Sequence, residues 1–149
     1  MTMLVLIVED DENRMAVFRG NLFVRDAITW APTAADGIRL LKLHKYDLVM
    51  LDHDLADEHY MNIEFTAESA ASYALEGTGQ DVARFIATMD DPPPFVFVHS
   101  WNPTGALAME STLKAAGIST FRSPFGSADL KRGIIQYREA FNKLVGLDC

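Results

Sequence analysis

Five short apolar runs, each followed by a segment with helical spacing, constrain the fold of this chain more than any other feature. The first run is continuous and rich in β-branched residues, which is typical of a strand buried on both faces of a parallel sheet. Strands that alternate with helices predict a parallel sheet covered by helices on both sides. The pattern therefore predicts an α/β, doubly wound, five-stranded sheet, with strands at Met3–Val8, Ala27–Ala31, Tyr46–Asp52, Phe95–Ser100 and Ile118–Arg122.

Apolar residues at helical spacing follow each run and predict the helices. The clearest helix begins at Gly77–Gly79, where Thr78 is placed to cap it, and Pro92–Pro94 interrupts the chain before the next strand. Gly117 closes a helix predicted from Thr104 to Ala116. The remaining apolar positions are Met15, Phe18 and Leu22, then Ala34, Ile38 and Leu41 within Thr33–Lys42, then Val82, Phe85, Ile86 and Met89, and finally Leu130, Ile134, Tyr137, Phe141 and Leu144.

The segment 56–76 interrupts this regular alternation. It mixes acids, small residues and scattered aromatics, and it is too long for an ordinary loop between a strand and a helix. The chain of 149 residues otherwise suits one domain with one substantial core. We therefore predict a single domain over residues 1–149 with an inserted flap at 56–76 after the third strand.

Charge and cysteine content limit the partners and the compartment. Thirteen basic against twenty-one acidic side chains give a net charge of -8, which disfavours an extended DNA or RNA surface because such surfaces rest on Lys and Arg. A small nucleotide or a single RNA end remains compatible with this net charge, since the charge of a local site can differ from that of the whole chain. The single cysteine, Cys149, cannot form an internal disulfide, and no apolar run is long enough to span a membrane. These observations predict a cytoplasmic protein without a membrane anchor.

Polar side chains stand at the ends of three of the predicted strands. They are Glu9–Asp11, Asp52–Asp54 and His99–Ser100. In open α/β sheets the ligand site lies beyond the carboxyl ends of the strands. We therefore expect these side chains to meet at one rim of the sheet.

The segments LIVEDD, DLVMLD and AGISTFRSPF resemble the first, third and fifth strands of response-regulator receiver domains. This resemblance implies the strand order 2-1-3-4-5, a Mg²⁺ site at Glu9 and Asp10, and a phosphoryl-accepting aspartate at Asp52. The chain departs from the receiver pattern at two strand ends. His99 stands where receivers have Thr or Ser, and Ser123 stands where they have Lys, which argues against an ordinary two-component switch.

A narrower resemblance rests on LDHDL, TGQDVA and VHSWNP, which occur in this order. They contain Asp52–Asp54, Thr78–Gly79, His99–Ser100 and Asn102–Pro103. Together they resemble the cyclic-phosphate-processing receiver domains of bacteria and mobile elements. That resemblance implies a receiver fold and a role that involves cyclic phosphates.

Carboxylates at adjacent strand ends would crowd together and favour a cation. Two like charges about 4 Å apart repel by roughly 4 kcal/mol at an effective dielectric constant of about 20. Mg²⁺ or Mn²⁺ suits an all-oxygen ligand set, and a histidine nearby would shift the preference toward Mn²⁺, Fe²⁺ or Zn²⁺. We predict Glu9, Asp10, Asp52 and Asp54 as ligands. The alternatives are that one acid caps a helix and another is solvated, and that Asp54 fixes an imidazole.

The histidines at the strand ends suggest proton transfer. Imidazole can act as acid or base near neutral pH, so we predict His99 and His53 as catalytic together with Asp52. Asp52 could instead attack phosphorus and form an aspartyl phosphate. A structural role is the alternative for either histidine.

Ser100, Asn102 and Ser123 are the predicted substrate-binding residues, because each could hydrogen-bond a phosphate or a base. Asn102, followed by a proline, fits the start of an ordinary helix equally well. Arg14 and Arg122 could neutralise a phosphate, but solvation at the surface is the expectation for both.

The leading interpretation is a metal-dependent phosphoesterase acting on a cyclic phosphate, a cyclic nucleotide or an RNA end. Its partner would be a small phosphorylated ligand or nucleotide. The alternative is a non-catalytic pseudo-receiver that docks a partner protein or holds a nucleotide as a sponge. Receiver-like domains often pair through their fourth helix and fifth strand, so a homodimer is compatible, although no decisive apolar patch marks that face.

Overall fold

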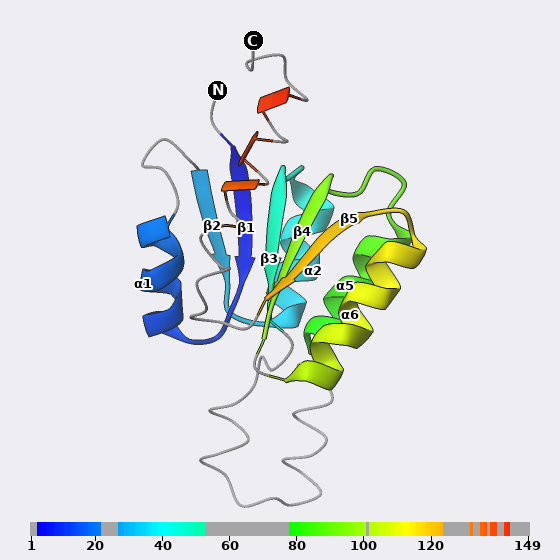
Figure 1. The fold of residues 1–149 in the computed structure, drawn as a ribbon, viewed down its shortest axis with the longest axis horizontal. Coiled ribbons are helices and arrows are strands. Elements are labelled where there is room, and N and C mark those ends of the chain that lie inside the picture. Colours follow the sequence, from blue (N-terminus) through cyan, green and yellow to red (C-terminus); the bar gives the residue numbers. More distant parts are fainter. Residues whose placement is uncertain are drawn as a thin grey trace, which may run out of the picture.

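A computed structural model describes residues 3–21, 27–52, 78–100 and 102–123, and seven residues between 132 and 143. Each predicted strand in these ranges is present, and Figure 1 shows them side by side in one sheet. The elements in chain order are β1 (Leu4–Val8), α1 (Glu12–Asn21), β2 (Ala27–Ala31), α2 (Ala34–Leu43), β3 (Leu48–Leu51), α5 (Gly79–Thr88), β4 (Phe95–His99), α6 (Pro103–Ala115) and β5 (Ser119–Ser123).

The sheet is parallel throughout and has the order β2-β1-β3-β4-β5. The predicted doubly wound architecture and the predicted strand order are therefore confirmed. The predicted flap at 56–76 lies outside the described residues, as do the five apolar positions that defined the final helix. The described residues between 132 and 143 are helical.

Helix ends follow from local capping. The Thr33 side chain accepts a hydrogen bond from the backbone N–H of Asp36 and so starts α2. Thr78 and Asp81 form a reciprocal capping box at the start of α5, which confirms the capping role predicted for Thr78. Gly117 has a φ of 80° just after α6, a left-handed conformation that glycine adopts at the lowest cost.

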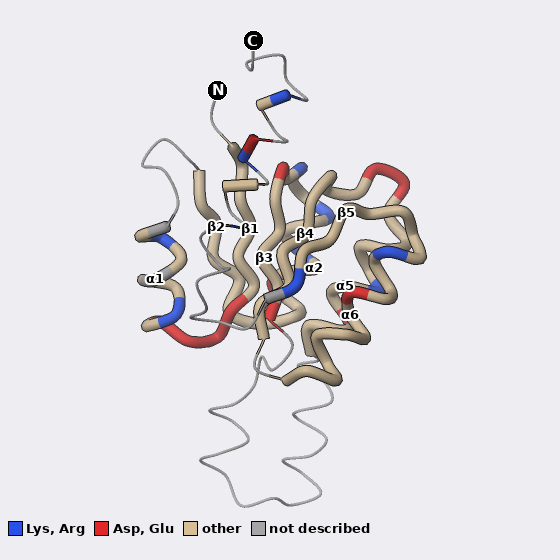
Figure 2. Tube along the Cα trace, in the orientation of Figure 1, with Lys and Arg blue, Asp and Glu red and all other residues tan. Residues whose placement is uncertain are grey.

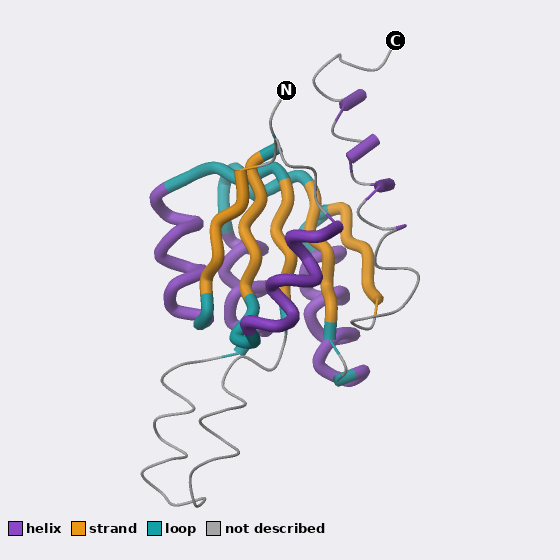
Figure 3. Tube along the Cα trace, turned by 90° about the vertical axis from the view of Figure 1, so that its left-hand side faces the viewer, coloured by secondary structure: helices purple, strands orange, loops and turns teal. Residues whose placement is uncertain are grey.

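The two faces of the sheet pack against different helices, because successive side chains of a strand point to opposite sides. Figure 3 views the sheet from the side of α1, with α2, α5 and α6 behind it. The face toward α1 carries Val5, Ile7, Leu48, Met50 and Phe97, which pack with Met15 and Phe18. The opposite face carries Leu6, Val8, Val49, Leu51, Val96 and Val98, which pack with the other helices.

Candidate functional site

The register of the sheet brings three predicted site residues into one row. The last paired residues of β1, β3 and β4 are aligned with one another, so Glu9, Asp52 and His99 continue these strands side by side at the carboxyl edge. Ser123, at the end of β5, pairs with His99 in the same row. The alternation of side chains along a strand places Glu9, Asp52 and His99 on the face that α1 covers. The predicted meeting of strand ends at one rim is thus observed.

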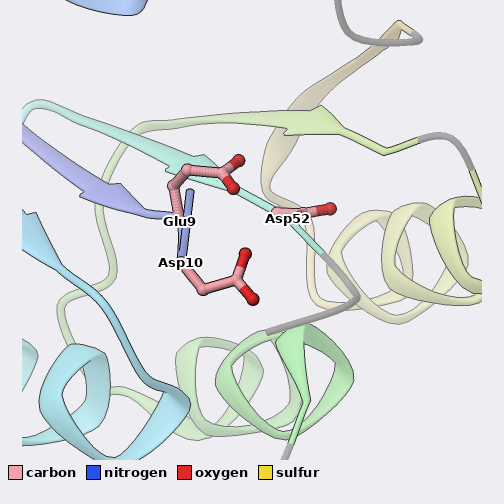
Figure 4. A group of neighbouring side chains, drawn as sticks. All are labelled: Glu9, Asp10 and Asp52. Carbon is pink, nitrogen blue, oxygen red and sulfur yellow. The ribbon is translucent and has the colours of Figure 1, made fainter. Parts of the chain in front are cut away.

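Three carboxylates converge at this rim, and Figure 4 shows their side chains beside the ends of β1 and β3. Glu9, Asp10 and Asp52 each offer an oxygen atom within 4.8 Å of the others. Glu9 is 1% exposed and Asp52 is 5% exposed, so water screens these charges poorly. Three carboxylate oxygens form the hard donor set that Mg²⁺ and Mn²⁺ prefer, and the residues present therefore fit such a cation.

The acidic stretch between β1 and α1 is continuous in Figure 2, and its residues have different structural roles. The Asp11 side chain accepts a hydrogen bond from the Arg14 backbone N–H at 2.9 Å and thereby caps α1. The Asp11 backbone N–H donates to Glu9 Oε1 at 3.1 Å and helps to orient that carboxylate. One acid of this stretch is therefore a helix cap, as the sequence allowed, while Glu9 and Asp10 turn toward Asp52.

Arg14 lies among the three carboxylates, so the expectation that it is solvated at the surface was wrong. Its Nε donates to Glu9 Oε1 at 2.8 Å, and its Nη2 lies 3.1 Å from Asp10 Oδ1 and 3.4 Å from Asp52 Oδ2. The side chain is 22% exposed. Arg14 follows Asp10 by four residues, but no local signal in the sequence indicated that its side chain would face the strand ends.

Burial raises the pKa of the Glu9 carboxyl from 4.5 to about 7, although the Arg14 guanidinium opposes the rise. A buried carboxylate loses hydration that one partly exposed guanidinium only partly replaces. Without a metal, Glu9 therefore exchanges its proton near neutral pH. A cation at the rim would favour the ionised form.

The raised pKa of Glu9 predicts a pH dependence of stability for the metal-free protein. The unfolded carboxyl titrates near 4.5 and the folded one near about 7, so the contribution of Glu9 to the free energy of unfolding falls as pH rises through this window. The whole shift corresponds to on the order of 3 kcal/mol. We expect Glu9→Gln to lack this fall, which urea denaturation of variant and wild type across the same pH range will measure. Parallel profiles would contradict the raised pKa.

His99 lies behind Glu9 at the end of β4. Its ring is 1% exposed, its Nε2 lies 3.6 Å from Glu9 Oε2, and its edge contacts the ring of Phe18 at a centroid distance of 4.3 Å. Burial, aided by the charge of Arg14, lowers the pKa of His99 from 6.5 to about 3. Neither ring nitrogen has a hydrogen-bond partner within the described part of the chain. The imidazole is therefore neutral at pH 7 and keeps one donor and one acceptor for a ligand.

The structure describes Ser100 and Asn102 among the other predicted site residues. Ser100 is buried, and its hydroxyl oxygen accepts a hydrogen bond from the Asn102 backbone N–H at 3.1 Å. The Asn102 side chain accepts from the Gly105 backbone N–H at 2.9 Å, so it caps α6, the structural alternative that the sequence offered. His53 and Asp54 lie outside the described residues, and their roles remain predictions, as does the substrate-binding role of Ser123.

Arg122 has the surface position that the sequence predicted. Its side chain is 42% exposed, and its Nε lies 3.4 Å from Glu110 Oε1 on α6. This pair lies on the β5 and α6 side of the sheet, away from the contacts that Arg14 makes with the carboxylates. The cation that the described part of the site contributes is thus Arg14.

Several solved structures that share this architecture are receiver domains. A signal receiver domain from Vibrio parahaemolyticus is 21% identical, with a TM-score of 0.65, and the match covers 97% of this chain and 98% of that one. A CheY-like receiver domain protein from Methanospirillum hungatei is 16% identical, with a TM-score of 0.65 and coverages of 96% and 98%. A third, from Methylobacillus flagellatus, is 15% identical, with a TM-score of 0.61 and coverages of 91% and 98%. The fold and its acidic rim thus define a receiver-like domain.

Within this class, the family model of the cyclic-phosphate processing receiver domain matches residues 5–115. The chain belongs to that family. No curated protein matches the sequence. Among the described helices, none combines the length and the apolar character that crossing a membrane requires.

Proposed function

We propose that this protein is a divalent-metal-dependent phosphoesterase that acts on a small cyclic phosphate, either a cyclic nucleotide or the cyclic end of an RNA. The observation that carries the proposal is the meeting of Glu9, Asp10 and Asp52 within 4.8 Å at the carboxyl edge of the sheet. The family's description supports cyclic phosphates as the substrate class. Residues 1–149 would act as one cytoplasmic domain.

Glu9, Asp10 and Asp52 would hold Mg²⁺ or Mn²⁺, with Asp54 as a further candidate ligand. Bound there, the ion would supply positive charge for phosphate oxygens and make a nearby water molecule more acidic. His99 Nε2 lies 3.6 Å from Glu9 Oε2, so a phosphate held at the rim would lie near this imidazole. The net charge of -8 favours a small ligand over an extended nucleic acid.

His99 would act on the substrate as a neutral imidazole. Its lone pair can accept a proton, and its N–H can donate a hydrogen bond to a phosphate oxygen. His53 is the second candidate for proton transfer, because it follows Asp52 directly. Ser100 and Ser123 flank the row and would contact the ligand. Attack of Asp52 on phosphorus is a second route with the same residues, although the lysine that pairs with an aspartyl phosphate in receivers is replaced by Ser123.

A non-catalytic role is the second candidate, and the position of Arg14 favours it. The guanidinium already neutralises part of the carboxylate cluster, and His99 is shielded by Glu9 and Phe18. Such a closed site could hold a nucleotide as a sponge without cleaving it. A pseudo-receiver that docks a partner protein, or a homodimer, would not need the site at all.

One assay separates these candidates. The protein is incubated with 2′,3′-cyclic and 3′,5′-cyclic nucleotides and with an oligonucleotide ending in a cyclic phosphate, each with Mg²⁺ or Mn²⁺, and products are followed by chromatography. We expect turnover that disappears in His99→Ala. Stoichiometric binding of an unchanged ligand would indicate the sponge instead. Absence of both binding and turnover would leave the docking module.

A further inference from the structure

The Arg14 side chain makes two different kinds of contact at the rim. Its Nε donates to Glu9 Oε1 at 2.8 Å, which is a short charge-assisted hydrogen bond. Its Nη2 spans Asp10 and Asp52 at 3.1 and 3.4 Å, of which the second is at the limit for a hydrogen bond. The same Nη2 also lies 2.7 Å from Glu9 Oε1, so Glu9 holds the guanidinium through two nitrogen atoms, and the contact with Asp52 is the longest of the set.

A divalent cation and Nη2 would compete for the same carboxylates. Asp10 and Asp52 both contact Nη2, and both belong to the cluster that fits the cation. A divalent cation bound to these carboxylates would repel the guanidinium strongly, because water screens charges poorly in mostly buried surroundings. The cation and the guanidinium therefore cannot both keep their full set of contacts with the three carboxylates.

The backbone of Arg14 is fixed in α1, while its side chain is partly exposed. The Arg14 N–H donates to the Asp11 side chain at 2.9 Å, and the residue lies in the first turn of α1. The side chain is 22% exposed, in contrast to 1% for Glu9. A pivot of the guanidinium on Glu9 would move Nη2 away from Asp10 and Asp52 without disturbing α1.

We propose that Arg14 has two positions and links metal loading to phosphate recognition. In the metal-free protein, Nη2 takes the place of the cation on Asp10 and Asp52. When a divalent cation binds, the guanidinium pivots on Glu9, so that Nε keeps its bond to Glu9 while Nη2 leaves Asp10 and Asp52 and donates to an oxygen of the bound phosphate. A guanidinium suits this task because its donors are fixed in one plane and match phosphate oxygens. The inference rests on the metal-binding part of the proposed function.

Arg14 would thereby supply a positive charge that the last residue of β5 does not. Ser123 ends β5 opposite His99, and a serine side chain carries no charge. Arg14 approaches the same rim from α1 instead. Phosphate recognition would then depend on a residue of α1, and it would occur only in the metal-loaded protein.

Calorimetry with Mn²⁺ alone, and then with orthophosphate added to the Mn²⁺-loaded protein, tests both halves. We expect Arg14→Met to bind Mn²⁺ about tenfold more tightly, because a competing cation is removed, and to bind orthophosphate about tenfold more weakly. The matched control is Arg39→Met, which removes an exposed arginine whose Nη2 lies 3.6 Å from Asp36 on α2, and it should match wild type in both titrations. Unchanged or weaker Mn²⁺ binding by Arg14→Met would overturn the competition, and unchanged phosphate binding would overturn the recognition.

A crystal structure of wild-type protein with Mn²⁺ and orthophosphate tests the inference without any variant. We expect Nη2 within hydrogen-bond distance of a phosphate oxygen and Nε still on Glu9. Nη2 remaining on Asp10 and Asp52 beside a bound Mn²⁺ would overturn the two-position role. Absence of Mn²⁺ binding in wild type and variant alike would overturn this inference and the metal-dependent function together. Binding without turnover would overturn the hydrolase alone.

Discussion

Replacing Asp52 with asparagine is expected to abolish turnover of a cyclic phosphate and to weaken Mn²⁺ binding about a hundredfold or more, since loss of a residue that merely supports a metal ligand already costs about 10–100-fold. Asparagine keeps the shape of the side chain but removes its charge. Asp52 contributes one of the three clustered carboxylates, and it is also the acceptor if phosphorus is attacked by the protein. Both chemical routes therefore fail in this variant.

Calorimetry with Mn²⁺ and chromatography of cyclic-phosphate products measure the two effects of Asp52→Asn. Asp91→Asn is the matched control, because Asp91 lies just before β4 at the other edge of the sheet, where its mostly exposed carboxylate pairs with Lys45 at 2.9 Å. We expect the control to behave as wild type. If Asp52→Asn binds Mn²⁺ as tightly as wild type does, Asp52 is not a metal ligand. If it still turns over substrate, both routes are wrong.

The sheet was predictable because its strands are buried on both faces. Met3–Val8 is apolar at every position, and a charged residue, Glu9, marks its end, so β1 was recognised to within one residue. The third strand was predicted too long at its start. Tyr46 is buried, but Asp47 turns its carboxylate onto the Leu4 backbone N–H at 2.8 Å before β3 begins. Burial alone therefore did not distinguish a strand from the turn that precedes it.

The convergence of Glu9, Asp52 and His99 was predictable for a topological reason. In a parallel sheet the carboxyl ends of adjacent strands share one edge, so polar residues that directly follow buried strands must lie near one another. The prediction needed only the number of strands and their order. It did not need the rotation of any helix.

The role of Arg14 was not predictable from the same pattern. Its reach to Glu9 depends on how α1 is rotated against the sheet, which the packing of Met15 and Phe18 decides. An arginine after a run of acids is usually solvated, and nothing local showed that this one would face the strand ends. Asn102 illustrates the same limit, since a helix cap and a ligand contact require the same residue type.

The fully buried ring of His99 leads to the largest expected effect on stability. Its pKa is about 3 in the folded protein against 6.5 in the unfolded chain, so the unfolded chain takes up a proton first as pH falls. The stabilising contribution of the neutral ring is complete above 6.5 and is lost progressively toward about 3. The loss is about 2 kcal/mol at pH 5 and about 4 kcal/mol at pH 3.

We expect His99→Gln to lack this loss, because glutamine is polar but does not titrate. Its free energy of unfolding at pH 7.5 is expected to be lower than that of wild type, since a differently shaped side chain must fit beside Phe18. The readout is therefore the difference in free energy of unfolding between wild type and variant, measured by urea denaturation at pH 7.5 and at pH 5. This difference should shift by about 2 kcal/mol against wild type at pH 5, because the opposite contribution of Glu9 is present in both proteins. His44→Gln is the control, because it removes an exposed histidine, and its profile should parallel wild type.

The same titrations bear on the chemistry of the site. A wild-type profile that parallels His99→Gln would mean that the folded protein protonates His99 as readily as the unfolded chain, for example by pairing it with Glu9 at 3.6 Å. His99 would then be an imidazolium able to donate a proton to a leaving oxygen. The expected profile instead leaves a neutral ring at pH 7, which restricts His99 to accepting a proton or donating an N–H hydrogen bond to phosphate. Acid stability thus decides which half of acid–base chemistry this residue can perform.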